Sequence, residues 1–417
     1  MRSLTPCVLA LCLGGSASVW AQEAPVAPKA SAPPAVSSAE SSVPGLLDYD
    51  TPLTDALTPP NAKPDRMWMK ADYLLWWMSK SSNAPLIQVI PDSVATSGTF
   101  PAGAGQTVFP GDNRLDYGTI SGVRLNAGMW LNAGRSWGLD ASGFYLENRS
   151  ESAAFSSTGS PILTRFYNNI GGSQETYLLF SSIDPAGPYA GTLSASAEVS
   201  DFYNYDVSLR TNGYAIFSDS ADYVFGFRYA QLNESLNITG QAFLPDGRTL
   251  VVEDNYRVRN NFYGAQIGVA SRWVGLYGFS LDSVLKLAAG GVSQQVSISG
   301  SNAFIGLDGS VDRQNTGLWS TSSNIGTYNR TRFAVIPELN LNLNYSVTDR
   351  LAIYFGYSLM AISNVVRVSD AVNTNINDSS VRYISNTTPS TVANPGFTFT
   401  DNRMWLGGYS FGLRLEF

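Results

Sequence analysis

Residues 405–417, WLGGYSFGLRLEF, form the last stretch of the chain and decide its fold class. Counted back by twos from Phe417, the residues are apolar or aromatic except for Gly407, whereas those between them, from Gly408 to Glu416, are small or charged. Successive side chains of a β-strand point to opposite faces, so this stretch has one apolar face and one polar face. A strand that faces lipid on one side and a polar interior on the other has this pattern.

The same alternation recurs along the chain after Arg66. Its clearest internal example is 339–345, LNLNLNY, where leucines and a tyrosine share one face and asparagines share the other. Pro337, just before it, cannot donate a ladder hydrogen bond, so we expect a bulge or a strand entry there. Ten strands are predicted in all, at 66–78, 117–131, 136–149, 199–217, 222–239, 257–271, 278–299, 329–347, 351–368 and 403–417.

The connections between these strands are predicted to alternate between short and long. The short ones lie at 132–136, 218–221, 272–276 and 348–350, and the long ones at 79–116, 150–198, 240–256, 301–328 and 369–402. Short periplasmic turns and long outer loops are typical of outer-membrane barrels. We therefore predict an all-β fold, a closed antiparallel transmembrane β-barrel of about ten strands. Twelve strands are the alternative, if 150–198 hides a further hairpin.

Composition favours the same class. Charged residues make up 14% of the chain and aromatic residues 12%, whereas a soluble domain carries about 25% charged residues. The formal net charge of −7 argues against nucleic acid as a partner, because a phosphate-binding face needs a basic excess. An exported soluble β-sandwich is the remaining alternative for the fold.

The chain contains no histidine, and its two cysteines, Cys7 and Cys12, both lie near its start. Catalysis by Ser-His-Asp or Cys-His groups is thereby excluded, as are metal sites built on histidine. Known barrel enzymes of the outer membrane use a histidine base. We therefore expect no enzymatic activity, no catalytic residue, no metal site and no cofactor.

The first part of the chain has the features of an export signal. Residues 1–21 begin with the positive Arg2, continue with a short apolar run and end in Val19-Trp20-Ala21, which resembles a cleavage site. Residues 22–65 are rich in Ala, Pro and Ser and cannot bury enough apolar surface to fold. They are predicted to be a disordered periplasmic lead, either an ordinary linker or a segment that contacts the cell wall. Residues 66–417 are predicted to form the barrel.

Several separate segments, in order along the chain, match a known family. They are WMKADYLLWW (68–77) followed by Pro85-Leu86, NFYGAQIG (261–268), SNIGTY (323–328), FAVIPE (333–338), Gly356-Tyr357 and SNVVR (363–367). Over about 66–417 the chain resembles the bacterial outer-membrane β-barrel porin family called type seven. The resemblance implies an outer-membrane barrel, and it implies no particular substrate.

In the predicted barrel, the polar row of each strand faces the lumen. Its charged members, which we take as candidate lumen-lining residues, are Lys70, Asp72, Arg124, Asp140, Asp206, Arg210, Arg228, Asp282, Lys286, Glu338, Arg414 and Glu416. Both signs are present, which leaves two interpretations. In a wide pore such charges tune ion selectivity, whereas in a narrow ten-stranded barrel they pair across a packed interior.

Two functions follow from these interpretations. The first is a porin-like barrel of the bacterial outer membrane that acts as a passive conduit for small solutes or ions. The alternative is a closed structural or adhesive barrel whose long outer loops bind a surface partner. In both, the expected partners are outer-membrane lipid, the barrel-assembly machinery and, through 22–65, the cell wall. Phe417, at the end of the last strand, is the expected assembly signal.

Overall fold

The computed structural model describes residues 66–91, 105–169, 174–180, 190–215, 217–377 and 396–417. The predicted signal, 1–21, and the predicted lead, 22–65, lie outside these ranges. No helix within them is long and apolar enough to cross a membrane.

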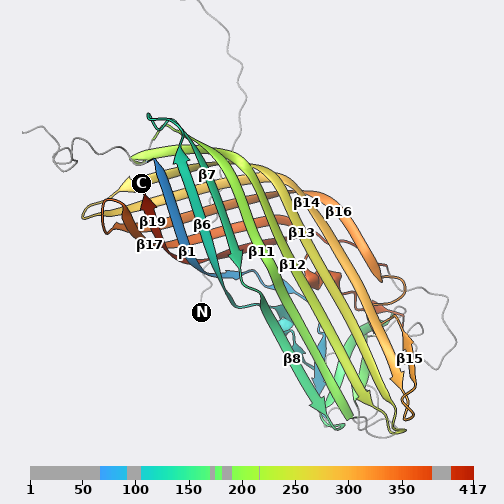
Figure 1. Ribbon diagram of the computed structural model, residues 1–417. Coiled ribbons are helices and arrows are strands. Elements are labelled where there is room, and N and C mark those ends of the chain that lie inside the picture. Colours follow the sequence, from blue (N-terminus) through green and yellow to red (C-terminus); the bar gives the residue numbers. More distant parts are fainter. Residues whose placement is uncertain (1–65, 92–104, 170–173, 181–189, 216, 378–395) are drawn as a thin grey trace, which may run out of the picture. The chain divides into compact units, whose positions relative to one another are not determined.

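Ten antiparallel strands close into a barrel, which confirms the predicted fold class and strand number (Figure 1). The ring closes where the first strand pairs with the last, from Trp68 opposite Glu416 to Met78 opposite Leu406. The strands are β1 (Met67–Met78), β6 (Thr119–Trp130), β7 (Trp137–Leu146), β11 (Ala190–Asn212), β12 (Ser220–Phe243), β13 (Thr249–Val274), β14 (Phe279–Ile305), β16 (Gly326–Ser346), β17 (Leu351–Val365) and β19 (Asn402–Glu416).

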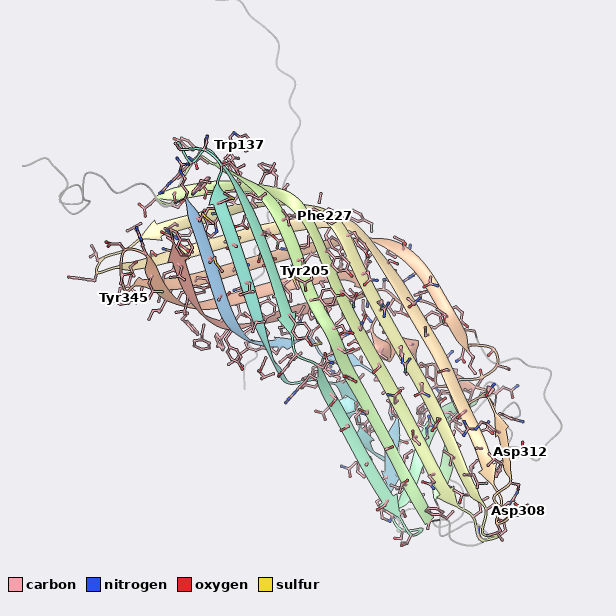
Figure 2. The ribbon with its side chains drawn as sticks, viewed as in Figure 1. Trp137, Tyr205, Phe227, Asp308, Asp312 and Tyr345 are labelled. Carbon is pink, nitrogen blue, oxygen red and sulfur yellow. The ribbon has the colours of Figure 1, made fainter. Side chains whose placement is uncertain are left out.

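The apolar row of each barrel strand lies on the outer surface. On β12, Tyr223, Phe225 and Phe227 are exposed, whereas the next inward residue, Arg228, is fully buried. Phe227 and Tyr205, from neighbouring strands, belong to this outer row (Figure 2). Exposed aromatic side chains in a continuous band mark the surface that faces hydrocarbon.

Part-way along the long strands, the outward row changes from apolar to polar residues, and the inward row changes from polar to apolar residues. On β12 the outward row is aromatic as far as Tyr229 and polar from Gln231 onward, to Asn237 and beyond. The inward row changes the other way, from Arg228 to apolar residues such as Leu232. Strands β11, β13 and β14 change in the same manner. Beyond the change the sheet is therefore built like that of a soluble protein, with its apolar face inward. We call this part (190–202, 230–243, 249–262 and 290–305) the extension.

A row of tyrosines lies at the boundary between the lipid-facing band and the extension. The rings of Tyr203 and Tyr229 are 5.9 Å apart between centroids, and those of Tyr229 and Tyr263 are 4.9 Å apart. The hydroxyls of Tyr203 and Tyr229 donate to the side-chain oxygen of Gln231, at 2.9 and 3.0 Å. Tyrosines with an apolar ring and a solvated hydroxyl are enriched at membrane interfaces, so this row marks the edge of the bilayer.

The extension corrects the predicted loops. The range 240–256 was expected to be a long loop, but strand continues through most of it, whereas 301–328 does contain a long connection between β14 and β16. Strands β12 and β13 are joined by the tight turn 244–248, in which Gly247 has a φ of +84°. Strict alternation of short and long connections is therefore wrong. The predicted strands 222–239 and 257–271 stop short of the turn 244–248, although the ladder continues to it with its apolar face reversed.

The alternative of twelve barrel strands is also wrong, although 150–198 does contain further strands. β8 (Arg149–Ser157) continues along β11 beyond the end of β7. β9 (Ile162–Asn169) and β10 (Gln174–Phe180) form the predicted hairpin, but they join a second sheet instead of the barrel. Its other strands are β3 (Ile87–Ile90), β4 (Gln106–Phe109) and β18 (Asn375–Ile376). The remaining short elements are β2 (Ser81–Ser82), β5 (Arg114–Leu115), β15 (Val311–Gln314), η3 (Gly111–Asn113) and α1 (Val368–Ala371).

This second sheet packs against the inner face of the extension. Together with 317–321 and 366–371 it forms a unit that we call the plug. Plug and extension share one apolar core whose members include Leu86, Ile87, Phe109, Leu163, Tyr167, Leu193, Leu236, Val252, Tyr256, Val296, Trp319 and Val366. The inward apolar row of the extension is therefore buried by segments that the sequence predicted to be outer loops.

Pro337 marks the end of one of the two ladders of β16. The strand pairs with β14 on both sides of the proline, but with β17 only on its C-terminal side. Beyond it, the Val335 amide donates to the Ser363 hydroxyl at 2.9 Å, and the Asn364 side chain donates to the Phe333 carbonyl at 2.7 Å. The expected bulge or strand entry is absent from this place. Proline has no N–H, so side chains replace the missing ladder bonds.

The lipid-facing assignment of β12 can be tested with two substitutions on its outward row. Phe225→Arg, within the aromatic band and away from its Tyr229 edge, is expected to lower the free energy of unfolding by about 2–4 kcal/mol, the cost of a cation in the middle of the hydrocarbon. Asn237→Arg, on the same face of the extension, is expected to change it by less than about 0.5 kcal/mol. Denaturant unfolding in lipid vesicles measures both. Equal effects at the two positions would contradict the assigned membrane boundary.

Candidate functional site

The interior of the membrane-level barrel contains a network of ion pairs. Seven cations and seven carboxylates take part, so the network is balanced in formal charge. The cations are Lys70, Arg124, Arg210, Arg228, Arg272, Lys286 and Arg414, and the carboxylates are Asp72, Asp140, Asp206, Asp222, Asp282, Glu338 and Glu416.

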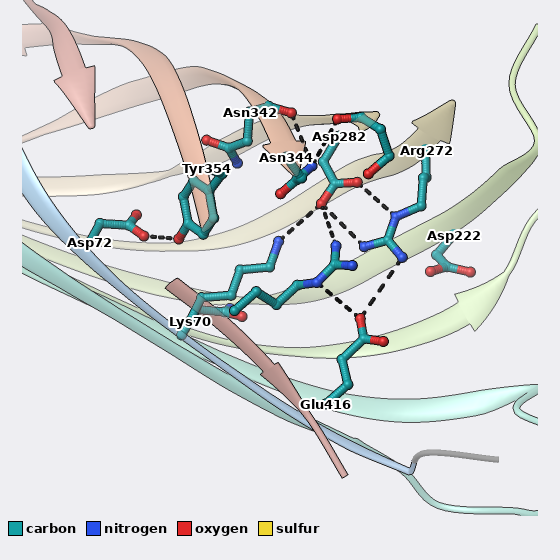
Figure 3. Close-up of polar contacts among 12 residues, drawn as sticks. Lys70, Asp72, Asp222, Arg272, Asp282, Asn342, Asn344, Tyr354 and Glu416 are labelled. Carbon is teal, nitrogen blue, oxygen red and sulfur yellow. Dashed lines mark hydrogen bonds and ion pairs between the residues drawn. The ribbon is translucent and has the colours of Figure 1, made fainter. Parts of the chain in front are cut away.

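Asp282 on β14 is the centre of the network at the end that carries the short turns (Figure 3). Its carboxylate accepts from Arg272 at 2.8 Å, from Arg414 at 3.2 Å and from Lys70 at 3.4 Å. Glu416 then accepts from Arg414 at 3.0 Å. Four strands are joined here, because β13 supplies Arg272, β1 supplies Lys70 and β19 supplies the other two.

A second group lies deeper in the barrel, around Asp206 and Glu338. Lys286 donates to Asp206 at 2.7 Å, and Arg228, fully buried, bridges Asp206 and Glu338. Glu338 also accepts from the Asn340 side chain at 2.6 Å. These groups come from β11, β12, β14 and β16, so the network crosses the lumen instead of following one strand.

Asp72 on β1 makes the third group. Arg124 on the neighbouring β6 donates to it at 2.5 Å, and the Tyr354 hydroxyl on β17, which only β19 separates from β1, donates to its other oxygen. Arg124 reaches further, to the Asn340 side-chain oxygen at 2.7 Å. Asp72, Asp206 and Glu338 thus each have a charged partner and a neutral donor, which is the arrangement a buried ion pair needs to offset its desolvation.

The structure places all twelve candidate residues on the inner face of the barrel, and all twelve belong to this network. Sequence reasoning missed Asp222, Arg272 and Tyr354. Asp222 is the first residue of the predicted strand 222–239, and Arg272 lies one residue beyond the predicted strand 257–271. Both share the parity of the inward rows, so the period-two pattern could have found them. Tyr354 is inward on β17, but its row there carries no charged residue, so the pattern gives no such signal.

Two cavities lie within the network. The larger has a volume of about 320 Å³ and opens at the short-turn end, where Trp68, Trp130, Arg135 and Arg210 line it. The smaller, deeper one has a volume of about 70 Å³ and lies among the groups around Asp72, Asp206 and Glu338. The interior therefore narrows from the mouth toward the plug.

The plug is held to the extension by two buried carboxylates on the inward rows. The first is Glu234 on β12, whose two oxygens accept from Arg367 at 2.8–2.9 Å. The Val368 amide donates to the same carboxylate at 3.0 Å. Arg367 also donates to the Ser79 carbonyl at 3.2 Å. One carboxylate therefore fixes the segment that begins α1.

The second plug contact is Asp254 on β13. Arg165 on β9 donates to it at 2.6 Å, and both side chains are fully buried. The Trp319 and Ser320 amides donate to its other oxygen at 3.0 and 2.7 Å. The guanidinium of Arg165 lies 4.0 Å from the ring centroid of Trp319. Removing one partner from such a fully buried pair costs about 3–5 kcal/mol, because the other charge is left buried and unpaired.

Within the described ranges, no group of carboxylate, histidine or cysteine side chains could hold a metal ion.

Comparison with known proteins gives one family and several distant structures. The sequence profile of the family described as "Putative beta barrel porin-7 (BBP7)" matches residues 68–417. No curated protein has a matching sequence.

Three solved structures illustrate the distant structural likeness. The outer-membrane protease OmpT from Escherichia coli is 10% identical, covers 85% of this chain and 97% of its own, and has a TM-score of 0.36. The TodX deltaS2S3 mutant monoaromatic hydrocarbon channel is 11% identical, with coverages of 88% and 92% and a TM-score of 0.22. A Pseudomonas aeruginosa FadL homologue is 8% identical, with coverages of 85% and 90% and a TM-score of 0.21. At such TM-scores these likenesses say nothing about the activity of this chain.

The central role of Asp282 can be tested by removing its charge. Asp282→Asn leaves three cations around a neutral group, and we expect the free energy of unfolding to fall by about 3–5 kcal/mol, as for a broken buried pair. The matched control is Asp246→Asn, which breaks an exposed pair with Arg248 and should cause no measurable change. Unfolding of both variants in detergent micelles gives the comparison. A cost for Asp282→Asn no larger than that of the control would contradict the network.

Proposed function

The chain belongs to the family described as "Putative beta barrel porin-7", and from this premise we propose that it is a closed, plugged barrel of the bacterial outer membrane. The observation that supports this is the single apolar core shared by plug and extension. Water and ions do not pass through a packed apolar core, whose density matches that of an organic crystal. In this form the protein is a structural barrel that presents the extension to a surface partner.

The charge balance of the interior supports the same proposal. A pore that selects ions concentrates one sign of charge along its wall. Here each carboxylate of the network has a cation within 4 Å, so little field remains to attract a permeating ion. A ten-stranded barrel is narrow enough for such pairing, since barrel diameter grows with strand number.

A passive conduit for small solutes or ions is the second candidate. It is favoured by the two cavities, which lead inward from the short-turn end. To conduct, the protein would have to displace the plug, and the two carboxylates Glu234 and Asp254 hold that plug in place. The two candidates therefore differ in one physical property, the state of the plug in the resting protein.

Other expectations remain proposals. The Phe417 ring is exposed, and its backbone closes the barrel, because its carbonyl accepts from the Arg66 and Met67 amides at 2.6 and 3.1 Å. An exposed aromatic end group beside the closing strand pair suits recognition by the assembly machinery. A cell-wall contact through 22–65 concerns residues outside the described ranges. A catalytic role is not proposed, since the chain has no histidine base.

Conductance of the refolded protein in planar lipid bilayers distinguishes the two candidates. We expect no stepwise current from the native chain. The double variant Glu234→Ala/Asp254→Ala loses both plug contacts, and we expect it to show stepwise openings.

The matched control for that measurement is Asn233→Ala/Glu253→Ala, which changes the neighbouring outward residues of the same strands and should stay silent. Steady current from the native chain, equal to that of the variant without plug contacts, would overturn the closed barrel and support the passive conduit.

A further inference from the structure

The larger cavity lies in the mouth of the barrel. It opens at the short-turn end and shares the lining residues Lys70, Arg210 and Val284 with the cavity of about 70 Å³. Its volume of about 320 Å³ lies within the range of small-molecule sites, which often occupy the mouths of β-barrels. A molecule that enters such a pocket stops in it, provided that the barrel is closed as proposed above.

The charges that line the pocket are not balanced, unlike those of the network as a whole. Five cations face three carboxylates there, namely Lys70, Arg135, Arg210, Arg272 and Arg414 against Asp222, Asp282 and Glu416. Asp282 and Glu416 are engaged by Lys70, Arg272 and Arg414. Arg210 is paired with Asp222 and Asp140, so the lining cation without an ion pair in the described part of the chain is Arg135.

Two guanidinium groups of the pocket retain unused donors. The Nε atoms of Arg135 and Arg210 are buried and have no hydrogen-bond partner in the described part of the chain. A buried donor without a partner costs free energy, and an anionic acceptor would recover that cost. Arginine is well suited to this task, because its planar group binds carboxylates in a fixed geometry.

An aromatic wall completes the pocket. The rings of Trp68 and Trp130 lie 5.7 Å apart between centroids, and the guanidinium of Arg210 lies 4.9 Å from the Trp68 ring centroid. Tryptophan at the inner surface of a polar lumen provides a flat apolar surface beside the cations. A hydrated barrel mouth that only admits water would need neither the aromatic wall nor the excess positive charge.

We propose that this pocket is a binding site for a small organic carboxylate that carries an apolar ring. The carboxylate accepts from Arg135 and Arg210, and the ring lies against Trp68 and Trp130. The ligand enters from the short-turn end, which faces the periplasm in barrels of this kind. The proposal goes beyond the closed barrel, because a structural barrel needs no ligand.

The test uses three probes of similar size and different charge, namely benzoate, benzyl alcohol and benzylamine. Titration calorimetry of the folded full chain in detergent micelles measures their affinities. We expect saturable binding of one benzoate, about tenfold tighter than benzyl alcohol, which is the scale of a charge-assisted hydrogen bond. Benzylamine should bind most weakly. Benzylamine binding as tight as that of benzoate, or benzoate binding that does not saturate, would overturn the proposal.

Two variants separate the charge from the aromatic wall. Arg135→Gln should bring benzoate to within about twofold of benzyl alcohol, since the preference for the anion depends on the unpaired cation. Trp130→Leu should weaken both probes together. Arg248→Gln, at an exposed pair in the 244–248 turn, is the control and should change neither affinity. If Arg135→Gln keeps the full preference for benzoate, the proposed site is wrong.

The folded state of each variant is checked by its heat-modifiable migration in gel electrophoresis. The binding result and the conductance result are independent. If the native chain conducts but still binds benzoate through Arg135, the proposal of a closed barrel is wrong and the proposal of a binding site stands. If the native chain shows no current and does not bind benzoate, the closed barrel stands and the proposed binding site is wrong.

Discussion

The constraint on which the structure depends is that every backbone polar group in hydrocarbon needs an internal partner. Ten strands meet it by closing β1 onto β19, so that no ladder edge faces lipid at the membrane level. Closure of so few strands leaves a narrow lumen, and the inward rows then face one another at short range. Charged residues on these rows can be accommodated only if they pair, which is why Asp282 and Asp206 each collect several cations.

The interior is filled in two different ways along its length. At the membrane level ion pairs cross the lumen, whereas in the extension an apolar core is shared with the plug. The boundary between the two coincides with the tyrosine row on the outside, where Tyr229 gives way to Gln231. The function that we propose rests on this division, in which the paired charges leave a pocket at one end and the apolar core fills the other.

The sequence predicted the barrel well, because the period-two rows that specify it are local and continuous. It predicted the inward placement of all twelve charged candidates for the same reason. It failed for 240–256, where the ladder continues with its apolar row on the inner face. The contacts of Glu234 with Arg367 and of Asp254 with Arg165 join residues far apart in the chain, and no local pattern indicates such pairs.

The reversal of the two rows on β11–β14 also determines how deep the protein sits in the bilayer. If the barrel slid toward the periplasm by two residues, Gln231 and its polar neighbours would enter hydrocarbon. If it slid outward, Phe227 and the other aromatic residues would leave lipid for water. Both displacements raise the free energy. The position where the outward row changes from aromatic to polar residues therefore fixes the depth of the barrel in the bilayer, without any contact to another protein.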